Sequence, residues 1–217
     1  MARPRTHHEE KKQELIKIAF ELFMKNGYEN TSIQDIMNAA QISKGAMYHY
    51  FICKEDVLDA VLNFIIDQDV KRLEPVFNNT SLSAMEKLIA AMSCGNVQTT
   101  GEIQQATEYI LKRRDSIFDY RARELSKNRT IPKLADLIRE GVASGEFRTD
   151  FPEEMASFIF ASSQSLSEMI MNQVGGPDFQ RAVDAFVQLL THCLGLEKSE
   201  QNFLSDFFKE QFEMALD

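Results

Sequence analysis

The sequence predicts an all-α protein, with a small three-helix head at the N-terminus and a larger helical bundle after it. Only nine glycines and five prolines occur in 217 residues, so few breaks in regular structure are expected. Apolar residues recur at helical spacing along most of the chain, and no segment alternates apolar with polar residues as a half-buried strand does. Long helices joined by few turns are the simplest structure that fits these observations.

Three helices are expected in the head. The first covers residues 9–26, which carry a broad apolar face. Thr31 is expected to cap the second helix, with Gln34 as the partner in a capping box. Ser43 is expected to cap the third helix.

A longer helix, residues 54–74, is expected to link the head to the rest of the chain and to stop at Pro75. It divides the chain into a head, residues 1–53, and a body, residues 54–217. The body is expected to contain further helices over residues 83–94, 101–113, 116–145, 153–173, 178–195 and 199–216, with a bend or break near Pro132 in the third of them.

The third helix of the head is too short and polar to be a core element. A break at residues 40–42 joins it to the second helix, as in a helix-turn-helix. Its first residues, Ser43 and Lys44, and the later Tyr48 offer the hydroxyls and the cation that contact with a DNA backbone needs. Ser43 could instead serve only as a cap, and Tyr48 could be a half-buried packing residue.

Two features of this helix favour an anionic partner. Lys44 stands in the first turn, where the helix dipole disfavours a cation unless a negative group lies nearby. Gly45 costs about 1 kcal/mol relative to alanine inside a helix, and its missing side chain would let DNA approach the backbone. Both choices are explained by nucleic acid at this surface.

The net charge of −9 argues at first against nucleic acid. The charge is unevenly spread, however, because residues 1–57 carry no net charge and hold three of the four histidines. All of the acidic excess lies in the remaining residues. DNA binding by the head would therefore depend on the placement of a few groups, and a dimer would double the contacts.

Other functional classes find little support. Cys53, Cys94 and Cys193 are widely spaced, so we expect neither disulfides nor a metal site, and a reducing cytosol is the natural compartment. His7 and His8 are expected to be solvated arm residues. We find no catalytic motif, and we expect no cofactor and no enzyme activity. Residues 1–12 lack an apolar stretch, so we expect no secretory signal there, and no apolar run approaches the length of about eighteen residues that a transmembrane helix needs.

A family resemblance follows from motifs in a fixed order. The head contains Gly-Tyr, then Thr-Ser-Ile, then Ser-Lys-Gly, then Tyr-x-x-Phe-x-x-Lys-Glu, all within residues 27–55. Residues 15–62 thereby resemble the N-terminal domain of the TetR (AcrR-like) family of bacterial transcriptional regulators. Gln41 departs from the family, which usually has glycine there, and this matters if the residue needs positive φ. Cys53 and Ile52 also replace residues that are more often polar.

The resemblance implies a DNA-binding surface. Cationic and aromatic residues of the family contact phosphates, and small residues lie near base edges, where Ala46 could offer only a methyl contact. The DNA-binding residues are expected to be Thr31, Ser43, Lys44, Gly45, Ala46, Tyr48, His49 and Lys54.

The resemblance also implies that the body dimerises through its last long helices. Residues 155–174 are apolar on more than one side, and residues 178–195 carry a further apolar face, which fits a helix pair shared between subunits. Burial inside one chain is the alternative. The expected interface residues are Phe158, Ser162, Leu166, Met169, Phe179, Val183, Phe186 and Leu190.

By the same resemblance, the body binds a small molecule between its helices. Aromatic and methionine side chains would suit a hydrophobic or amphipathic ligand, although such residues are also ordinary core residues. The expected ligand-binding residues are Phe64, Met92, Ile103, Tyr109, Phe118, Arg121, Phe160 and Gln164.

The sequence thus predicts a ligand-responsive DNA-binding transcriptional regulator of the bacterial cytosol and nucleoid. We expect a homodimeric repressor that a small effector releases from a palindromic double-stranded DNA operator, with no membrane partner. The effector would act by tilting the helix of residues 54–74. The alternative is a helical protein-interaction module whose head no longer binds DNA, and the neutral head, Gln41 and Ile52 motivate it.

Overall fold

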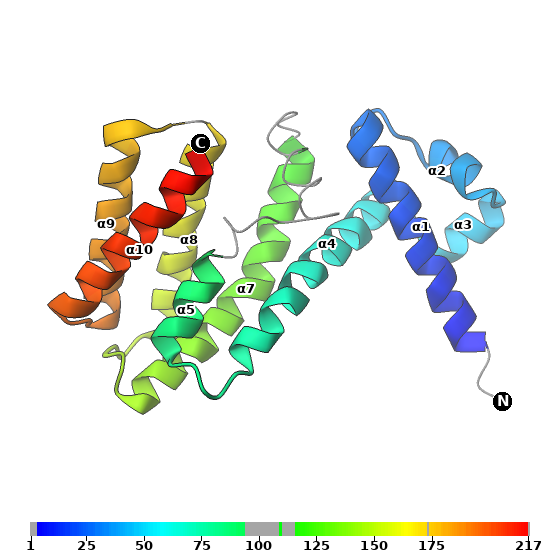
Figure 1. The fold of residues 1–217 in the computed structure, drawn as a ribbon. Helices are drawn as coiled ribbons and strands as arrows, with labels where there is room; N and C mark the ends of the chain where they lie inside the picture. The colour runs from blue at the N-terminus through cyan, green and yellow to red at the C-terminus, as the bar shows by residue number, and fades with distance from the viewer. Residues whose placement is uncertain (1–3, 94–108, 110–115, 173, 217) are drawn as a thin grey trace. The chain divides into compact units, whose positions relative to one another are not determined.

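The computed structural model describes residues 4–93, 109, 116–172 and 174–216 (Figure 1). Within these residues all regular structure is helical and no strand occurs, which confirms the predicted all-α class. The helices are α1 (Pro4–Asn26), α2 (Ile33–Ala40), α3 (Lys44–Tyr50), α4 (Lys54–Phe77), α5 (Ala84–Ser93), α7 (Ser116–Ser144), α8 (Pro152–Met171), α9 (Gly176–Leu194) and α10 (Lys198–Leu216).

Several predicted helix ends differ from the structure, two of them by three residues or more, and the break expected near Pro132 is absent because α7 continues through that residue. α1 begins at Pro4 rather than at residue 9, so that the histidines of the expected arm are helical. α4 does not stop at Pro75 but continues to Phe77. Proline removes one backbone N–H from the helix. Helical hydrogen bonding nevertheless continues beyond it, because the Asn78 N–H donates to the Glu74 carbonyl at 2.9 Å. The expected helix of residues 101–113 lies outside the described residues except for Tyr109.

Backbone contacts divide the chain into two units. The head unit contains residues 1–70 and 100–126, and the body unit contains residues 71–99 and 127–217. The division falls inside α4 and inside α7, because the first part of each helix packs with the head unit. A domain boundary between residues 53 and 54 stays a prediction.

The core of the head unit lies between α1, α2, α3 and the first part of α4. Along α1, Leu15, Ala19 and Phe23 follow at four-residue spacing, which places them on one helix face, and all three are fully buried. Met47 is the fully buried residue of α3 and joins the same core. Burial of a side chain of this size stabilises the fold by about 1.5–3 kcal/mol, which holds α3 in place.

The body unit has its own core. α9 packs against α8 and α10, and its buried face is formed by Phe179, Val183, Phe186, Val187, Leu190 and Leu194. The spacing of three and four residues explains this face as one stripe of a helix.

The turn after α7 fixes the start of α5 within the body unit. The Glu146 carboxylate accepts hydrogen bonds from the backbone N–H groups of Ala84 and Met85, at 3.2 and 3.1 Å. Partial burial opposes ionisation of Glu146, but these bonds outweigh it and hold its pKa below the ordinary value. The neighbouring Phe147 ring covers Gly141, where an added Cβ would lie 2.1 Å from a ring atom. The turn is therefore built by packing as well as by hydrogen bonds.

Candidate nucleic-acid interface

The N-terminus of α2 is capped by Ser32, not by Thr31 as the sequence analysis expected. The Ser32 hydroxyl accepts from the Asp35 N–H at 3.1 Å, and the Asp35 carboxylate accepts from the Ser32 N–H at 2.8 Å. Hydrogen bonds from the Ser32 hydroxyl and N–H hold the pKa of Asp35 below its ordinary value. Ser-x-x-Asp is itself a capping-box pattern, so a signal for Ser32 was present in the sequence.

Thr31 has a structural role in the head unit. Its side chain is buried, and its hydroxyl donates to the carbonyls of Gly27 at 2.8 Å and Leu22 at 3.3 Å. A buried hydroxyl that is already used in this way is not placed to contact a phosphate. The expected DNA-binding role of Thr31 is therefore corrected to that of a support for the loop before α2.

The turn between α2 and α3 requires positive φ at Gln41. This residue has φ 52° and ψ 44°, and it is the only non-glycine residue with positive φ among those described. Its N–H donates to Asn38, while the Ile42 N–H donates to Met37, which is the Schellman arrangement at a helix end. The two bonds satisfy the last carbonyls of α2 and set the direction in which α3 begins.

α3 presents one face to solvent and one to the core. The Ser43 hydroxyl caps it by accepting from the Ala46 N–H at 3.2 Å. Met47 anchors the inner face, whereas Lys44, Tyr48 and His49 are exposed.

The outer face has both charge and open space. The Lys44 ammonium lies 5.8 Å from the centre of the Tyr48 ring, which is 47% exposed. No atom lies within 4 Å of a Cβ built on Gly45. A cation, a phenol, an imidazole and an uncovered backbone thus lie together on one short helix, as a DNA-contacting surface needs.

Lys54 supports the loop between α1 and α2. Its ammonium donates to the Glu29 carbonyl at 3.2 Å and lies 4.2 Å from the centre of the Tyr28 ring. Tyr28 is itself buried and packs at 5.3 Å, edge to face, on Phe23. The half-buried Lys54 therefore ties the start of α4 to the loop that precedes α2.

Two predicted ligand-binding residues instead hold later segments to the head unit. The Tyr109 hydroxyl accepts from the Tyr28 N–H at 2.9 Å, and its ring packs 4.9 Å from that of Phe118. The Arg121 guanidinium lies 2.6 Å from both carboxylate oxygens of Asp59 on α4. This hydrogen bonding raises the pKa of Arg121.

The remaining predicted ligand-binding residues are distributed over both units. Phe64 packs against the head core, and Met92 packs against the body core. Phe160 and Gln164 are half-buried on α8. Ile103 lies outside the described residues.

Five of the eight predicted dimer residues are buried in the core of their own body unit. These five are Leu166, Phe179, Val183, Phe186 and Leu190. For them, burial within one chain accounts for the apolar pattern. Phe158 differs because 55% of its side chain is exposed, and Ser162 and Met169 are half-buried.

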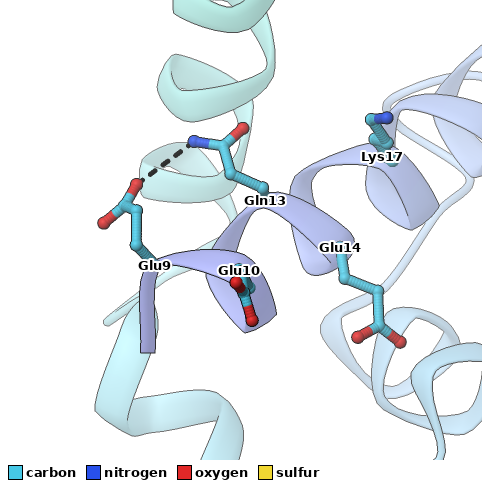
Figure 2. A pocket seen from close by; sticks show the side chains of 5 residues that line it. All are labelled: Glu9, Glu10, Gln13, Glu14 and Lys17. Atoms are coloured by element: carbon cyan, nitrogen blue, oxygen red, sulfur yellow. Dashed lines mark hydrogen bonds between the residues drawn. The ribbon is translucent and has the colours of Figure 1, made fainter. Parts of the chain in front are cut away.

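A surface depression of about 590 Å³ opens along α1 (Figure 2). It is lined by Glu9, Glu10, Gln13, Glu14 and Lys17, which all belong to that helix. Three carboxylates make this face unsuitable for an apolar ligand or for a phosphate. In the described part of the chain, no group of three metal-ligating side chains is found, and no helix is long and apolar enough to cross a membrane.

Comparison with known proteins gives a consistent result. The family model described as "Bacterial regulatory proteins, tetR family" matches residues 15–61. The HTH-type transcriptional repressor KstR2 of Mycolicibacterium smegmatis is 27% identical over 180 residues, which cover 77% of this chain and 82% of that protein. The fatty acid metabolism regulator protein of Bacillus subtilis is 26% identical and covers 75% of this chain and 84% of its own length.

The fold agrees with a solved TetR-family transcriptional regulator from Pectobacterium atrosepticum. The two share a TM-score of 0.66 and 24% sequence identity, over 88% of this chain and 98% of that one. The family match falls on the helices that contain the exposed α3 surface, and the fold likeness extends well beyond them. Residues 15–61 thus match the tetR family of bacterial regulatory proteins, and over 77% of its length the chain is similar to an HTH-type transcriptional repressor.

Proposed function

We propose that the protein is a homodimeric repressor of the bacterial cytosol, which leaves a palindromic operator when a small effector binds. The observation that carries the DNA-binding part is the exposed face of α3, where Lys44, Tyr48 and His49 reach solvent while Met47 is held in the core. Each head would place α3 in a major groove. Two heads would then meet half-sites about one helical turn, or a related spacing, apart.

Lys44 and Ala46 have different expected roles at this interface. The flexible ammonium of Lys44 suits a phosphate, and phosphate contacts set affinity without reading sequence. Ala46 offers only a methyl group, which can contact the methyl group of a thymine. Changes at Lys44 should therefore weaken binding to all sequences, while changes at Ala46 should alter sequence preference.

The proposed effector is a hydrophobic or amphipathic small molecule. The name of the Bacillus subtilis relative, a fatty acid metabolism regulator, is the reason to test fatty acids first. An effector must bind the free and DNA-bound states with different affinity in order to release DNA. Tyr109 and Arg121 support a way for an effector to act on the head unit. Movement of Tyr109 would alter its contact with Tyr28, and movement of Arg121 would alter its contact with Asp59.

The proposed homodimer would use the exposed part of the body. Phe158, with 55% of its side chain exposed on α8, is the strongest of the predicted residues for this role, and Ser162 is one turn away. An exposed phenylalanine contributes most when a partner covers it, because aromatic burial dominates interface energetics. Light scattering after size exclusion would measure the mass, and Phe158→Glu should shift the protein toward the monomer.

The first experiment is selection of bound fragments from random duplex DNA, followed by affinity measurements across salt concentrations. An enriched palindrome supports the dimeric repressor. Lys44→Ala should reduce the magnitude of the slope of log affinity against log salt by about 1.8, because each of the two heads loses one phosphate contact worth about 0.9. Lys198→Ala, a change at an exposed lysine at the start of α10, is the matched control and should leave the slope unchanged.

A folded dimer that enriches no sequence and binds DNA without salt dependence would contradict the proposal. That outcome would instead support a helical protein-interaction module. If an operator is enriched, fatty acids of increasing chain length are added to its complex with the protein, and release of DNA by none of them would exclude this effector class.

A further inference from the structure

The first turns of α1 continue the inner face of that helix toward α3. Leu15 and Ala19 mark this face by their complete burial. His8 precedes them at a spacing of seven and eleven residues, which places it on the same side of a helix. Glu10 and Glu14 do not share this spacing, and they line the depression along α1 that Figure 2 shows. His8 therefore points toward the helix proposed to contact DNA, although the sequence alone indicated a solvated arm.

α1 approaches α3 in the head unit (Figure 1). Three aromatic rings from these two helices meet there. The centroid of the His8 ring lies 5.2 Å from that of His49, edge to face, and 4.7 Å from that of Tyr50. The His49 and Tyr50 rings are 5.5 Å apart. Both imidazoles are exposed, while Tyr50 is half-buried against the head core. The half-buried ring of Tyr50 thus gives two exposed imidazoles a fixed support beside the proposed interface.

The helices that carry these rings also carry lysines. Lys12 stands one turn beyond His8 on α1, and Lys44 lies on α3. The nearest carboxylates in sequence, those of Glu9 and Glu10, line the depression along α1 (Figure 2). A phosphate of bound DNA would favour the charged form of an imidazole that it contacts. DNA would therefore add the negative charge that a protonated histidine needs here.

We propose that His8 is a DNA-contacting residue that acts with His49, and that protonation of this imidazole pair tightens DNA binding as the pH falls. The proposal rests on the proposed DNA-binding role of α3. Histidine is the side chain whose charge ordinarily changes between pH 5 and 8. If the bound state holds more protons than the free state, linkage requires affinity to rise with acidification. A protonated imidazole also adds a cation at the phosphates, so the salt dependence should steepen.

The test measures operator affinity by fluorescence anisotropy at constant ionic strength, at about pH 8 and about pH 6, on either side of the ordinary histidine range. The wild-type affinity should rise by about three- to tenfold at the lower pH, and the salt slope should steepen by about 0.9 for each added phosphate contact. His8→Gln should remove most of both changes. His192→Gln, a change at an exposed histidine of the body on α9, is the matched control and should keep them.

His8→Lys tests the role of the positive charge directly, because it places a permanent cation at the same position. It should bind at pH 8 with the steeper salt slope that the wild type reaches only at pH 6, and its affinity should change less with pH. Weaker binding by a folded His8→Lys protein at pH 8 would overturn the inference. So would an unchanged pH response in His8→Gln. Wild-type binding that is flat with pH refutes this inference alone, while no wild-type binding at either pH refutes DNA binding itself.

Discussion

The strained turn at Gln41 allows a quantitative prediction about the helix-turn-helix. Its φ of 52° lies in the left-handed region, which costs an L-residue about 1–2 kcal/mol. Glycine adopts this conformation without that cost, but it loses about 0.4–1 kcal/mol through its greater freedom in the unfolded chain. Gln41→Gly should therefore stabilise the protein by about 0.5–1 kcal/mol. For a chain of this length, that gain corresponds to an increase in Tm of about 1–4 °C.

A series at the same exposed position separates backbone strain from side-chain contacts. Gln41→Ala keeps the Cβ and should lie within about 0.5 kcal/mol of the wild type, as surface changes usually do. Gln41→Val should be the least stable, because β-branched residues fit the left-handed region poorly. Thermal unfolding followed by circular dichroism would give the order. Equal Tm values for the glycine and alanine variants would refute the strain argument.

Three further changes test features of the two units. Glu146→Gln should lower the free energy of unfolding by about 0.5–2 kcal/mol at neutral pH, because it removes a helix cap. The pKa of Glu146 is depressed in the folded protein, so this stabilisation is lost as the pH falls below 4.5 through the folded pKa. Unfolding measured across acid pH should therefore show the stabilities of the two proteins converging. Gly141→Ala should destabilise the protein by about 1–3 kcal/mol, because its Cβ would overlap the Phe147 ring. Gly45→Ala, in open space, should keep or raise Tm and weaken DNA binding. Equal Tm changes for the two variants would contradict this argument. Thr31→Val should lower the stability of the head by about 1 kcal/mol, because it removes the two hydrogen bonds of the Thr31 hydroxyl. A loss of DNA affinity at unchanged Tm would instead show that Thr31 contacts DNA.

Local patterns allowed much of the head to be predicted. The cap at Ser43 and the inward position of Met47 follow from helix periodicity and side-chain chemistry over a few residues. The choice between Thr31 and Ser32 could not be made in the same way, because both hydroxyls can cap a helix. It is decided by tertiary contacts, since the carbonyls of residues 22 and 27 take up the Thr31 hydroxyl.

The apolar face of α9 illustrates a different limit. Periodicity showed that residues such as Val183 and Leu190 would be buried, but burial against the same chain and burial against a partner produce the same pattern. Their place in the body core became evident only from the packing of α8, α9 and α10. In the same way, Tyr109 and Arg121 looked like residues of a pocket, and their partners Tyr28 and Asp59 are 81 and 62 positions away along the chain.

The division within α4 has a consequence for protein engineering. Val57, Leu58 and Val61 follow the expected boundary at residue 53 and are fully buried in the head core. An isolated fragment of residues 1–53 would expose the surfaces that these side chains cover, and should not fold alone. A chimeric regulator with a transplanted head should therefore carry α4 as far as Val70 and segment 100–126 from the same parent. The head unit is then exchanged as two separate stretches of sequence, and a single crossover point cannot transfer it.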